Sequence, residues 1–340
     1  MKIRRTSFLQ CIGLSSLVAL LAGCGLGTSS TTTIPVGQPV TEGTNPTSTG
    51  GKVIAFSKMS SNNPFFELIA EGMRDEAKKY GYEVKVVSGE ADVAKQKDQI
   101  MDFIVQKVAA IVLNPVDSAS IGPAIKEANK AGIPVFTCDL ECTDESAKVT
   151  AHIATDNYQG GKLAGEAMIE ALGENGGEIA ILTHDPAASC IKRVAGFDEV
   201  IKAYNAGRET GKITVVKRLP CEGQRDPGFK ATEDIITAHG NLAGIFAIND
   251  PGALGAYAAL EKHGKAGQVK IIGFDGQPDG LQAIKDGKIY ADPIQFPEKM
   301  GRQTIIAISK YLAGEEVDPI QLIPAELYRQ ADGAKDPRLN

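Results

Sequence analysis

The chain has 340 residues, of which 36 are Lys or Arg and 42 are Asp or Glu, so its formal net charge at pH 7 is −6. Nucleic-acid binding needs a concentrated basic surface, and the absence of any basic tract excludes that class of partner. The sequence also lacks a P-loop, an H-E-x-x-H motif and a G-x-S-x-G motif, and its four histidines are scattered. These absences argue against an enzyme, and neither a cofactor nor a metal site is expected.

The N-terminal residues have the features of an export signal. Basic side chains among the first five residues precede an apolar run, Ile12 to Leu21, that is too short to span a bilayer. The run leads into Leu21-Ala22-Gly23-Cys24, which resembles the bacterial lipobox, where the cysteine receives a lipid. We expect residues 1–23 to be removed and Cys24 to anchor the protein in the cell envelope, facing the periplasm or the exterior. An ordinary signal peptide with an incidental cysteine is the alternative.

Residues 24–51 are rich in Thr, Ser, Gly and Pro and contain almost no large apolar side chain. Such a segment cannot bury enough surface to offset the entropy of ordering, so we expect a lipidated tether. The remaining residues, about 290, exceed a single typical core and are enough for two domains.

Beyond the tether, short apolar runs rich in Val and Ile alternate with longer amphipathic segments. This alternation is typical of buried parallel strands joined by crossover helices. The expected strands are at 53–57, 83–88, 109–113, 134–138, 178–182, 213–217, 244–247, 269–273 and 290–294. The expected helices are at 64–80, 93–107, 119–131, 157–172, 191–206, 228–239, 251–263, 277–286 and 297–313. The sequence therefore predicts an α/β fold with doubly wound sheets.

Two stretches of the chain, residues 121–139 and 254–275, are similar to each other. Each has a helix of small residues, then a glycine, then an apolar strand that ends in aspartate. The similarity favours two lobes built on one plan, although any two helix–strand units are partly alike.

Four cysteines follow Cys24, an even number that fits disulfides in an oxidising compartment. We expect one disulfide in each lobe, although the sequence alone permits three connectivities. The expected pairs are Cys138 with Cys142 and Cys190 with Cys221. A four-cysteine zinc site is the alternative, but only one short spacing is present and no second pair mirrors it.

Polar residues gather where the expected strands end, which is the edge at which open parallel sheets bind ligands. They are Lys58, Asn63, Asp139, Asn249, Asp275 and Gln295. A carboxylate or carboxamide offers two polar atoms at the spacing of vicinal hydroxyls, and a buried hydroxyl without a partner costs about 1–3 kcal/mol. These residue types therefore suit a sugar or polyol.

Two aromatic residues, Phe65 and Phe66, follow Asn63 and offer faces that would cover the C–H face of a sugar. Their alternative role is core packing on the first helix. Asn63 precedes a proline, so helix capping is its alternative role, and a structural cap is the main role expected for Asp250 before Pro251.

Five motifs in the same order link the chain to a known family. They are NNPFF at 62–66, LNPVDS at 113–118, HIATDN at 152–157, FAIND at 246–250 and GFDG at 273–276. With them the chain resembles the ribose-binding-protein-like sugar-binding proteins of bacterial ABC importers. The resemblance implies a type I periplasmic binding protein, in which two Rossmann-like lobes are joined by a three-crossing hinge. The implied crossings lie near Ala154-Thr155, Gln295-Phe296 and Pro324.

The resemblance also implies the lobes and the function. The N-terminal lobe would comprise residues 52–154 and 296–324, and the C-terminal lobe residues 155–295 and 325–340. The protein would be a monomer that captures a monosaccharide or polyol by hinge closure and delivers it to an ABC permease and its ATPase. The alternative is a sugar sensor that presents its ligand to a chemotaxis or signalling receptor.

The family pattern places ligand contacts on seven residues of this chain. They are Asn63, Phe65, Phe66, Asp139, Asn249, Asp275 and Gln295. Two arginines of the pattern are missing, because Leu140 follows the aspartate and Ile191 stands where an arginine opens the second-lobe helix. We still expect Ile191 to contact the ligand from that position. Arg193 matches a later arginine to which the pattern gives no ligand contact.

A third departure lies near Gly223, where the family pattern has an aromatic residue of the second lobe. An arginine donates a rigid fork of hydrogen bonds to sugar oxygens, so the loss of two predicts a ligand other than ribose. Lys58, Glu141 and Arg225 are the expected substitutes for the missing polar contacts, with Lys58 preferred.

Overall fold

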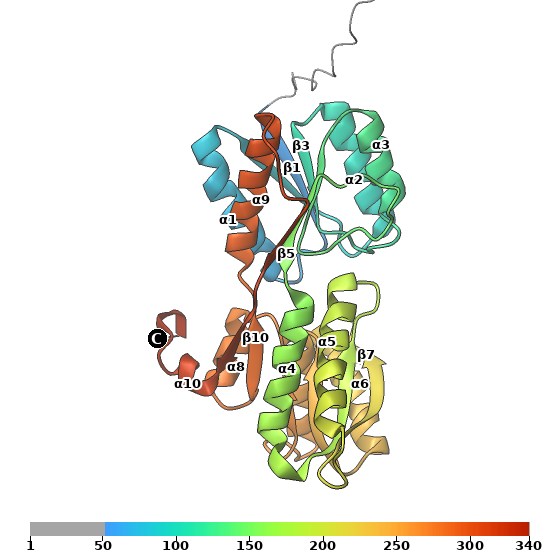
Figure 1. The fold of residues 1–340 in the computed structure, drawn as a ribbon, viewed down its shortest axis with the longest axis vertical. Coiled ribbons are helices and arrows are strands. Elements are labelled where there is room, and N and C mark those ends of the chain that lie inside the picture. The colour runs from blue at the N-terminus through green and yellow to red at the C-terminus, as the bar shows by residue number, and fades with distance from the viewer. Residues whose placement is uncertain (1–51, 340) are drawn as a thin grey trace, which may run out of the picture. The chain divides into compact units, whose positions relative to one another are not determined.

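The computed structural model describes residues 52–339, which fold into two sheets with helices on both faces (Figure 1). The expected export signal, the tether and Cys24 lie outside the described residues. All but one of the strand pairings are parallel, so the predicted α/β class is confirmed. Within residues 52–339, none of the helices combines the length and apolarity that a membrane crossing requires.

The first sheet has the strand order β11-β5-β4-β3-β1-β2. Helices α1 and α9 cover one face and α2 and α3 the other (Figure 1). The elements are β1 (Val53–Lys58), α1 (Phe65–Tyr80), β2 (Glu83–Ser88), α2 (Val93–Gln106), β3 (Ala110–Leu113), α3 (Gly122–Lys130), β4 (Val135–Cys138), β5 (Ala151–Thr155), α9 (Pro297–Leu312) and β11 (Ile320–Ile323).

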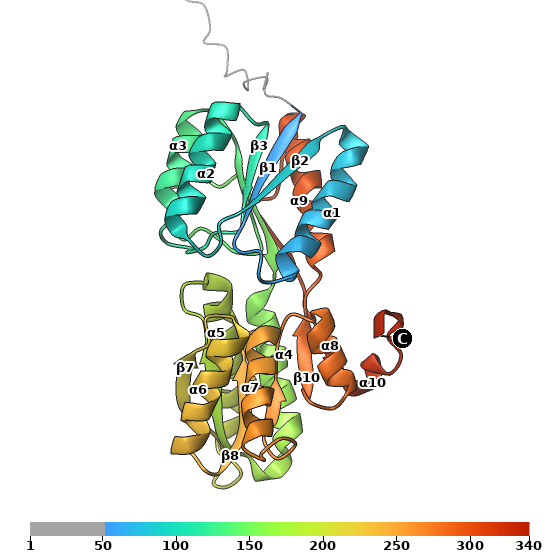
Figure 2. The same cartoon turned by 180° about the vertical axis from the view of Figure 1, so that it is seen from behind.

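The second sheet has the order β12-β10-β9-β8-β6-β7, with β12 antiparallel to β10. Figure 2 shows α6, α7 and α8 on the face opposite α4 and α5. The elements are α4 (Asn157–Leu172), β6 (Gly177–Thr183), α5 (Ala188–Asn205), β7 (Ile213–Pro220), α6 (Arg225–Ala238), β8 (Leu242–Ala247), α7 (Asp250–Lys262), β9 (Lys270–Ile272), α8 (Pro278–Lys285), β10 (Ala291–Ile294), β12 (Glu326–Arg329) and α10 (Gln330–Gly333).

The two sheets have the same plan. Corresponding strands follow one another in the same order, from the edge pair β2 and β7 to the edge pair β11 and β12. The two similar stretches of sequence occupy equivalent places, since α3 leads to β4 and α7 leads to β9. In the described residues the chain passes between the sheets after β5, β10 and β11.

Glycines allow helices on the same face to approach until their backbones touch. A Cβ on Gly161 of α4 would lie 2.1 Å from the carbonyl oxygen of Arg193 on α5, and a Cβ on Gly196 would lie 2.1 Å from that of Tyr158. Gly301 of α9 packs in the same way on Ile69 of α1. The contact between α4 and α5 places the first turns of both helices side by side at one end of the second sheet.

Each of the nine expected strands and nine expected helices is present, with ends shifted by at most a few residues. Three further strands, β5, β11 and β12, were not expected from the sequence. In β5 the polar His152 interrupts the apolar run, and the edge strands β11 and β12 are short and partly exposed. Pairing with neighbours, and not local hydrophobicity, makes these segments strands.

The two disulfides predicted from the cysteines are wrong, because all four are free thiols. Cys138 lies on the face of the first sheet that α1 and α9 cover, whereas Cys142 packs with α2 and α3 on the other side. In the second sheet, Cys190 Sγ lies 4.0 Å from Ser189 Oγ, while Cys221 packs against Gly252 at the start of α7.

We expect Gly161→Ala to lower the free energy of unfolding by roughly 1–3 kcal/mol, because the new methyl group must push α4 away from α5. Urea denaturation followed by circular dichroism measures this loss. Gly240→Ala is the matched control, because a Cβ at Gly240 meets no atom within 4 Å. An equal effect of both substitutions would contradict the close packing of the helices.

Candidate functional site

A cavity of about 320 Å³ lies at the carboxyl ends of the strands. Its walls come from the segments after β1, β2 and β4 of the first sheet and after β6, β7, β8, β9 and β10 of the second. This is the edge at which open α/β sheets bind ligands, and here the edges of two sheets contribute to one cavity.

Eight of the residues predicted to bind the ligand line this cavity. They are Asn63, Phe65, Phe66, Asp139, Arg225, Asn249, Asp275 and Gln295. The cavity is also lined by Leu140, which takes the place of one arginine of the family pattern. Strand ends distributed over most of the chain therefore meet in one place.

Three of the predicted residues, Lys58, Glu141 and Ile191, do not line this cavity. The Nζ of Lys58 donates a hydrogen bond of 2.7 Å to Glu67, which turns the lysine away from the cavity. Ile191 lies on the first turn of α5, where the side facing the cavity is formed by Ser189, Cys190 and Arg193. Its side chain is 52% exposed.

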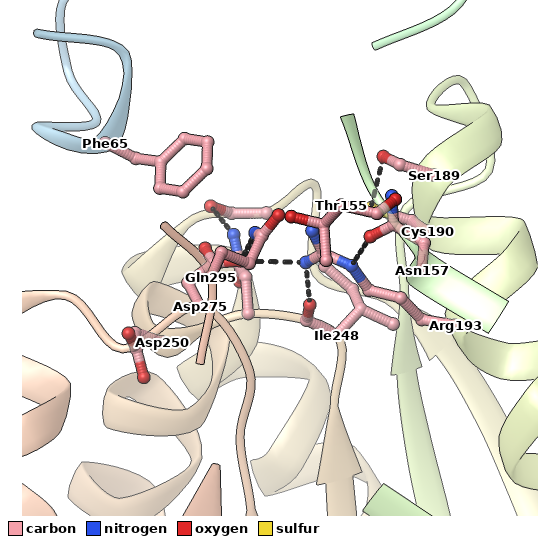
Figure 3. A network of polar contacts seen from close by, with 12 residues as sticks. Phe65, Thr155, Asn157, Ser189, Cys190, Arg193, Ile248, Asp250, Asp275 and Gln295 are labelled. Atoms are coloured by element: carbon pink, nitrogen blue, oxygen red, sulfur yellow. Dashed lines mark hydrogen bonds and ion pairs between the residues drawn. The ribbon is translucent and has the colours of Figure 1, made fainter. Parts of the chain in front are cut away.

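Arg193 is the main residue of the site that sequence reasoning missed (Figure 3). It is 4% exposed, and its guanidinium carbon lies 3.9 Å from the centroid of the Phe274 ring. Its Nε donates to Asn157 Oδ1 at 2.8 Å, and its Nη1 donates to the carbonyl of Ile248 at 2.6 Å. The sequence did contain a signal for this residue. Cys190, Arg193 and Phe197 are spaced so that they lie on one side of a helix, and that side of α5 is buried.

Asp275 forms an ion pair with Arg193. Its Oδ1 accepts hydrogen bonds from Arg193 Nη1 at 2.9 Å and from Gln295 Nε2 at 2.6 Å, and its Oδ2 accepts one from Gln277 Nε2 at 3.0 Å. Burial raises the pKa of Asp275, while Arg193 and the two glutamines oppose that rise. The carboxylate is thus oriented by donors from three segments of the second sheet.

Asp139 has no such set of partners. Its side chain is 5% exposed and its Oδ1 has no hydrogen-bond partner. Burial and the negative charge of Asp275 together raise its pKa to about 7, against the opposing charge of Arg193. Asp139 and Asp275 have φ angles of 67° and 109° in the left-handed region, which L-residues rarely adopt. Such backbone strain is found mostly at functional sites.

Both asparagines of the site accept a backbone hydrogen bond at the start of a helix, although the cap position of α1 is Pro64 and only Asn249 is itself a cap. Asn63 Oδ1 accepts from the backbone N–H of Phe65 at 2.9 Å, and Asn249 Oδ1 accepts from that of Gly252 at 3.0 Å. The cap of α7 is therefore Asn249, whereas Asp250, which we expected in that role, is the first residue of the helix. Each of these hydrogen bonds fixes the direction of an asparagine side chain at the cavity wall.

The aromatic wall comes from the first sheet. Phe65 and Phe66 are both buried, with ring centroids 5.8 Å apart and planes at 83°. Phe65 points toward the network around Asp275 and Gln295 (Figure 3). An apolar ring thus lies opposite a cluster of polar groups across the cavity.

The polar atoms left without partners are mostly acceptors. Besides Asp139 Oδ1, the buried Gln295 Oε1 and His184 Nε2 line the cavity without a hydrogen bond. A molecule that donates hydrogen bonds would satisfy these atoms. Residues 52–339 hold no group of three or more His, Cys, Asp or Glu side chains placed to bind a metal ion.

Comparison with known proteins places this architecture. The family model described as "Periplasmic binding protein domain" matches residues 54–316, most of the chain. The chain belongs to the periplasmic binding protein family. This family is one of solute-binding transport proteins and not of enzymes.

Individual members of the periplasmic binding protein family are similar along most of their length. The ribose import binding protein of Salmonella typhimurium is 36% identical over 264 residues, which cover 78% of this chain and 86% of that protein. The solute-binding protein of Actinobacillus succinogenes with bound D-allose is 27% identical, with a TM-score of 0.77, and covers 84% of this chain and 99% of its own. That of Bacillus halodurans with bound myo-inositol is 28% identical, with a TM-score of 0.76 and coverages of 84% and 97%.

We expect Arg193→Met to lower the free energy of unfolding by about 3–5 kcal/mol near pH 8, because it leaves buried Asp275 without its cation. The loss should be smaller at pH 5, where Asp275 can take up a proton and become neutral. Urea denaturation at both pH values measures the difference.

The control is Arg218→Met, which breaks the exposed pair between Arg218 and Asp198. A surface pair of this kind contributes about 0–1 kcal/mol, so little change is expected. A loss for Arg193→Met that is small or independent of pH would contradict the role assigned to this ion pair.

Proposed function

We propose that the chain binds a monosaccharide or polyol in this cavity and delivers it to the permease of an ABC importer. The observation that carries the proposal is the set of unpartnered acceptors, Asp139 Oδ1 and Gln295 Oε1, opposite the ring of Phe65. Sugar hydroxyls would donate to the two oxygens, and the aromatic face would cover the C–H groups of the sugar.

The size of the cavity supports a small ligand. Small-molecule sites span about 300–1,000 Å³, and the cavity of about 320 Å³ lies at the lower end. The related proteins are named for ribose import or carry D-allose or myo-inositol, which are ligands of this size. One monosaccharide or cyclitol is thus the proposed occupant.

The departures from the family pattern bear on which sugar is bound. Leu140 lines the cavity without a polar group, and Ile191 lies outside it. Arg193 is near the lost position, but it is already bonded to Asp275, Asn157 and Ile248. In the family pattern, two further arginines would donate hydrogen bonds to ribose and hold it in one pose. This site lacks both arginines, so a ligand that mainly donates hydrogen bonds suits it better.

Hinge closure is the proposed mechanism. We assign residues 52–154 and 296–324 to the N-terminal lobe and residues 155–295 and 325–340 to the C-terminal lobe. The cavity takes walls from both parts, so a sugar bound to one lobe would gain further hydrogen bonds as the other closes on it. The closed, loaded monomer would then dock on the permease.

A thermal-shift screen of pentoses, hexoses and cyclitols tests the proposed function, because a ligand that binds only the native state raises the melting temperature. The panel should include D-ribose, D-allose and myo-inositol. Amino acids and sugar phosphates serve as comparison classes. A shift by those classes alone would exclude the proposed ligand class.

We expect Asp139→Asn to weaken binding of the sugar identified in this screen about 10- to 100-fold at pH 8, where Asp139 with its pKa of about 7 is mostly ionised, since a hydrogen bond to a charged acceptor contributes about 1.5–3 kcal/mol. Isothermal titration calorimetry measures the affinity. The control is Asp234→Asn, at an exposed position of α6 outside the cavity. Unchanged affinity in Asp139→Asn would remove this residue from the site.

We also propose that Cys24 carries the lipid that holds the protein in the cell envelope. The support is the lipobox-like sequence at 21–24 and the polar tether after it. Cys24→Ser should move the expressed protein from the detergent phase to the aqueous phase of a Triton X-114 partition, because one acylated residue provides the apolar anchor. Identical partition of both forms would contradict the anchor.

A further inference from the structure

A pair of carboxyl groups lies beneath the cavity and takes no part in the polar network around Arg193. Asp250 is the first residue of α7 and Asp292 lies on β10. The Asp250 residue is 1% exposed and Asp292 is fully buried. Buried carboxyl groups are almost always paired with a cation or hydrogen-bonded, so this arrangement requires an explanation.

The two side chains occupy the space left by two glycines. A Cβ on Gly273 would lie 2.4 Å from Asp292 Oδ1 and 3.2 Å from Ala253 on the first turn of α7. A Cβ on Gly280 would lie 2.1 Å from Asp250 Oδ1. The carboxyl groups are therefore enclosed on both sides and contact each other across the start of α7.

Most of their oxygen atoms lack a donor. Asp250 Oδ2 accepts from the backbone N–H of Gln277 at 2.6 Å. Asp250 Oδ1 and both oxygens of Asp292 have no hydrogen-bond partner. Two ionised carboxylates cannot donate to each other, and leaving both charges in this enclosed space would cost far more than one proton bound between them.

The charges around the pair favour that proton. Asp275 faces both carboxyl groups and adds a third negative charge, while Arg193 is bonded to Asp275 and not to the pair. Burial and the neighbouring carboxyl raise the pKa of Asp250 well above its usual value, and burial raises that of Asp292 to about 6. With both values raised, the native state binds more protons than the unfolded chain.

Each member of the pair is tied to a residue of the cavity. Asp250 follows Asn249 and holds the backbone of Gln277, whose side chain donates to Asp275. Asp292 lies three residues before Gln295, which donates to the same aspartate. Repulsion between two charged carboxylates would thus displace the segments that carry Asn249, Asp275 and Gln295.

We propose that Asp250 and Asp292 share one proton, and that this proton positions the polar wall of the ligand cavity. Asp250 donates to Asp292 and keeps its other oxygen for the N–H of Gln277. The pair acts as a positioning device and has no contact with the ligand. The proposal rests on the proposed function only in assigning the cavity to a ligand, and its test needs no sugar.

The central variant is Asp250→Asn, which imitates the protonated state, since the amide group donates to Asp292 and its oxygen accepts from Gln277. In the wild type, each proton held only by the native state makes the unfolding equilibrium constant rise by up to tenfold per pH unit. Between about pH 5 and 7, we expect the unfolding equilibrium constant to rise less steeply with pH in Asp250→Asn and in Asp292→Asn than in the wild type. The difference should be up to a factor of ten per pH unit. The control Asp234→Asn, on the surface of α6, should keep the wild-type dependence of stability on pH. Comparison with this control corrects for the titration of other groups such as Asp139.

Two further measurements detect, separately, the protonated carboxyl group and the order of the segment that it positions. Infrared spectra at pH 6 should contain the C=O stretch of a protonated carboxylic acid in addition to the band of Asp139, whose pKa is about 7, and both variants should lack this additional band. Hydrogen exchange of residues 273–281, corrected for the intrinsic rate, should show protection that falls above pH 7 in the wild type and stays constant in Asp250→Asn. Both readouts apply to the wild type alone if a variant does not fold.

Three results would overturn the proposal. One is an infrared spectrum at pH 6 in which the wild type has no carboxylic acid band beyond those of the two variants. Another is an identical slope of stability against pH in the wild type and in both variants. The third is stabilisation by Ca²⁺ or Na⁺ in the wild type and in neither variant, because the pair would then hold a cation in place of a proton.

Discussion

The ion pair between Arg193 and Asp275 is the interaction on which the cavity depends. Through it, α5 is connected to α4 by Asn157, to the end of β8 by Ile248, and to the end of β10 by Gln295. A buried pair of this kind is stable only when its remaining donors and acceptors are satisfied. The hydrogen bonds that satisfy the pair are therefore also the ones that hold these separate segments in register.

The fold provides the conditions for this pair. Arg193 reaches Asn157 because the glycines of α4 and α5 bring the two helices into backbone contact. Phe274, directly before Asp275, covers one face of the guanidinium group and excludes water from it. Packing of helices far from the ligand thus determines the geometry of polar atoms at the cavity wall.

Charge is unevenly distributed around this pair. Asp139, Asp250, Asp275 and Asp292 are all buried near the cavity, and Arg193 is directly bonded to only one of them. Burial of a carboxyl group without a cation costs less free energy when the group binds a proton or accepts a hydrogen bond from a ligand. Asp139 opens onto the cavity and is available to hydroxyl donors, whereas the enclosed pair of Asp250 and Asp292 has only a proton to share.

The sequence by itself determined the α/β class, the positions of most elements and the polar strand ends that meet in the cavity, because hydrophobic periodicity and chain punctuation are local properties. It did not reveal β5, β11 or β12, whose strand character depends on pairing. Nor did it separate Arg193 from Ile191, since the two lie on one helical turn and only the packing of α5 decides which faces inward. Tertiary structure alone joined Asp250 to Asp292, because a buried charge is defined by neighbours that lie far apart along the chain.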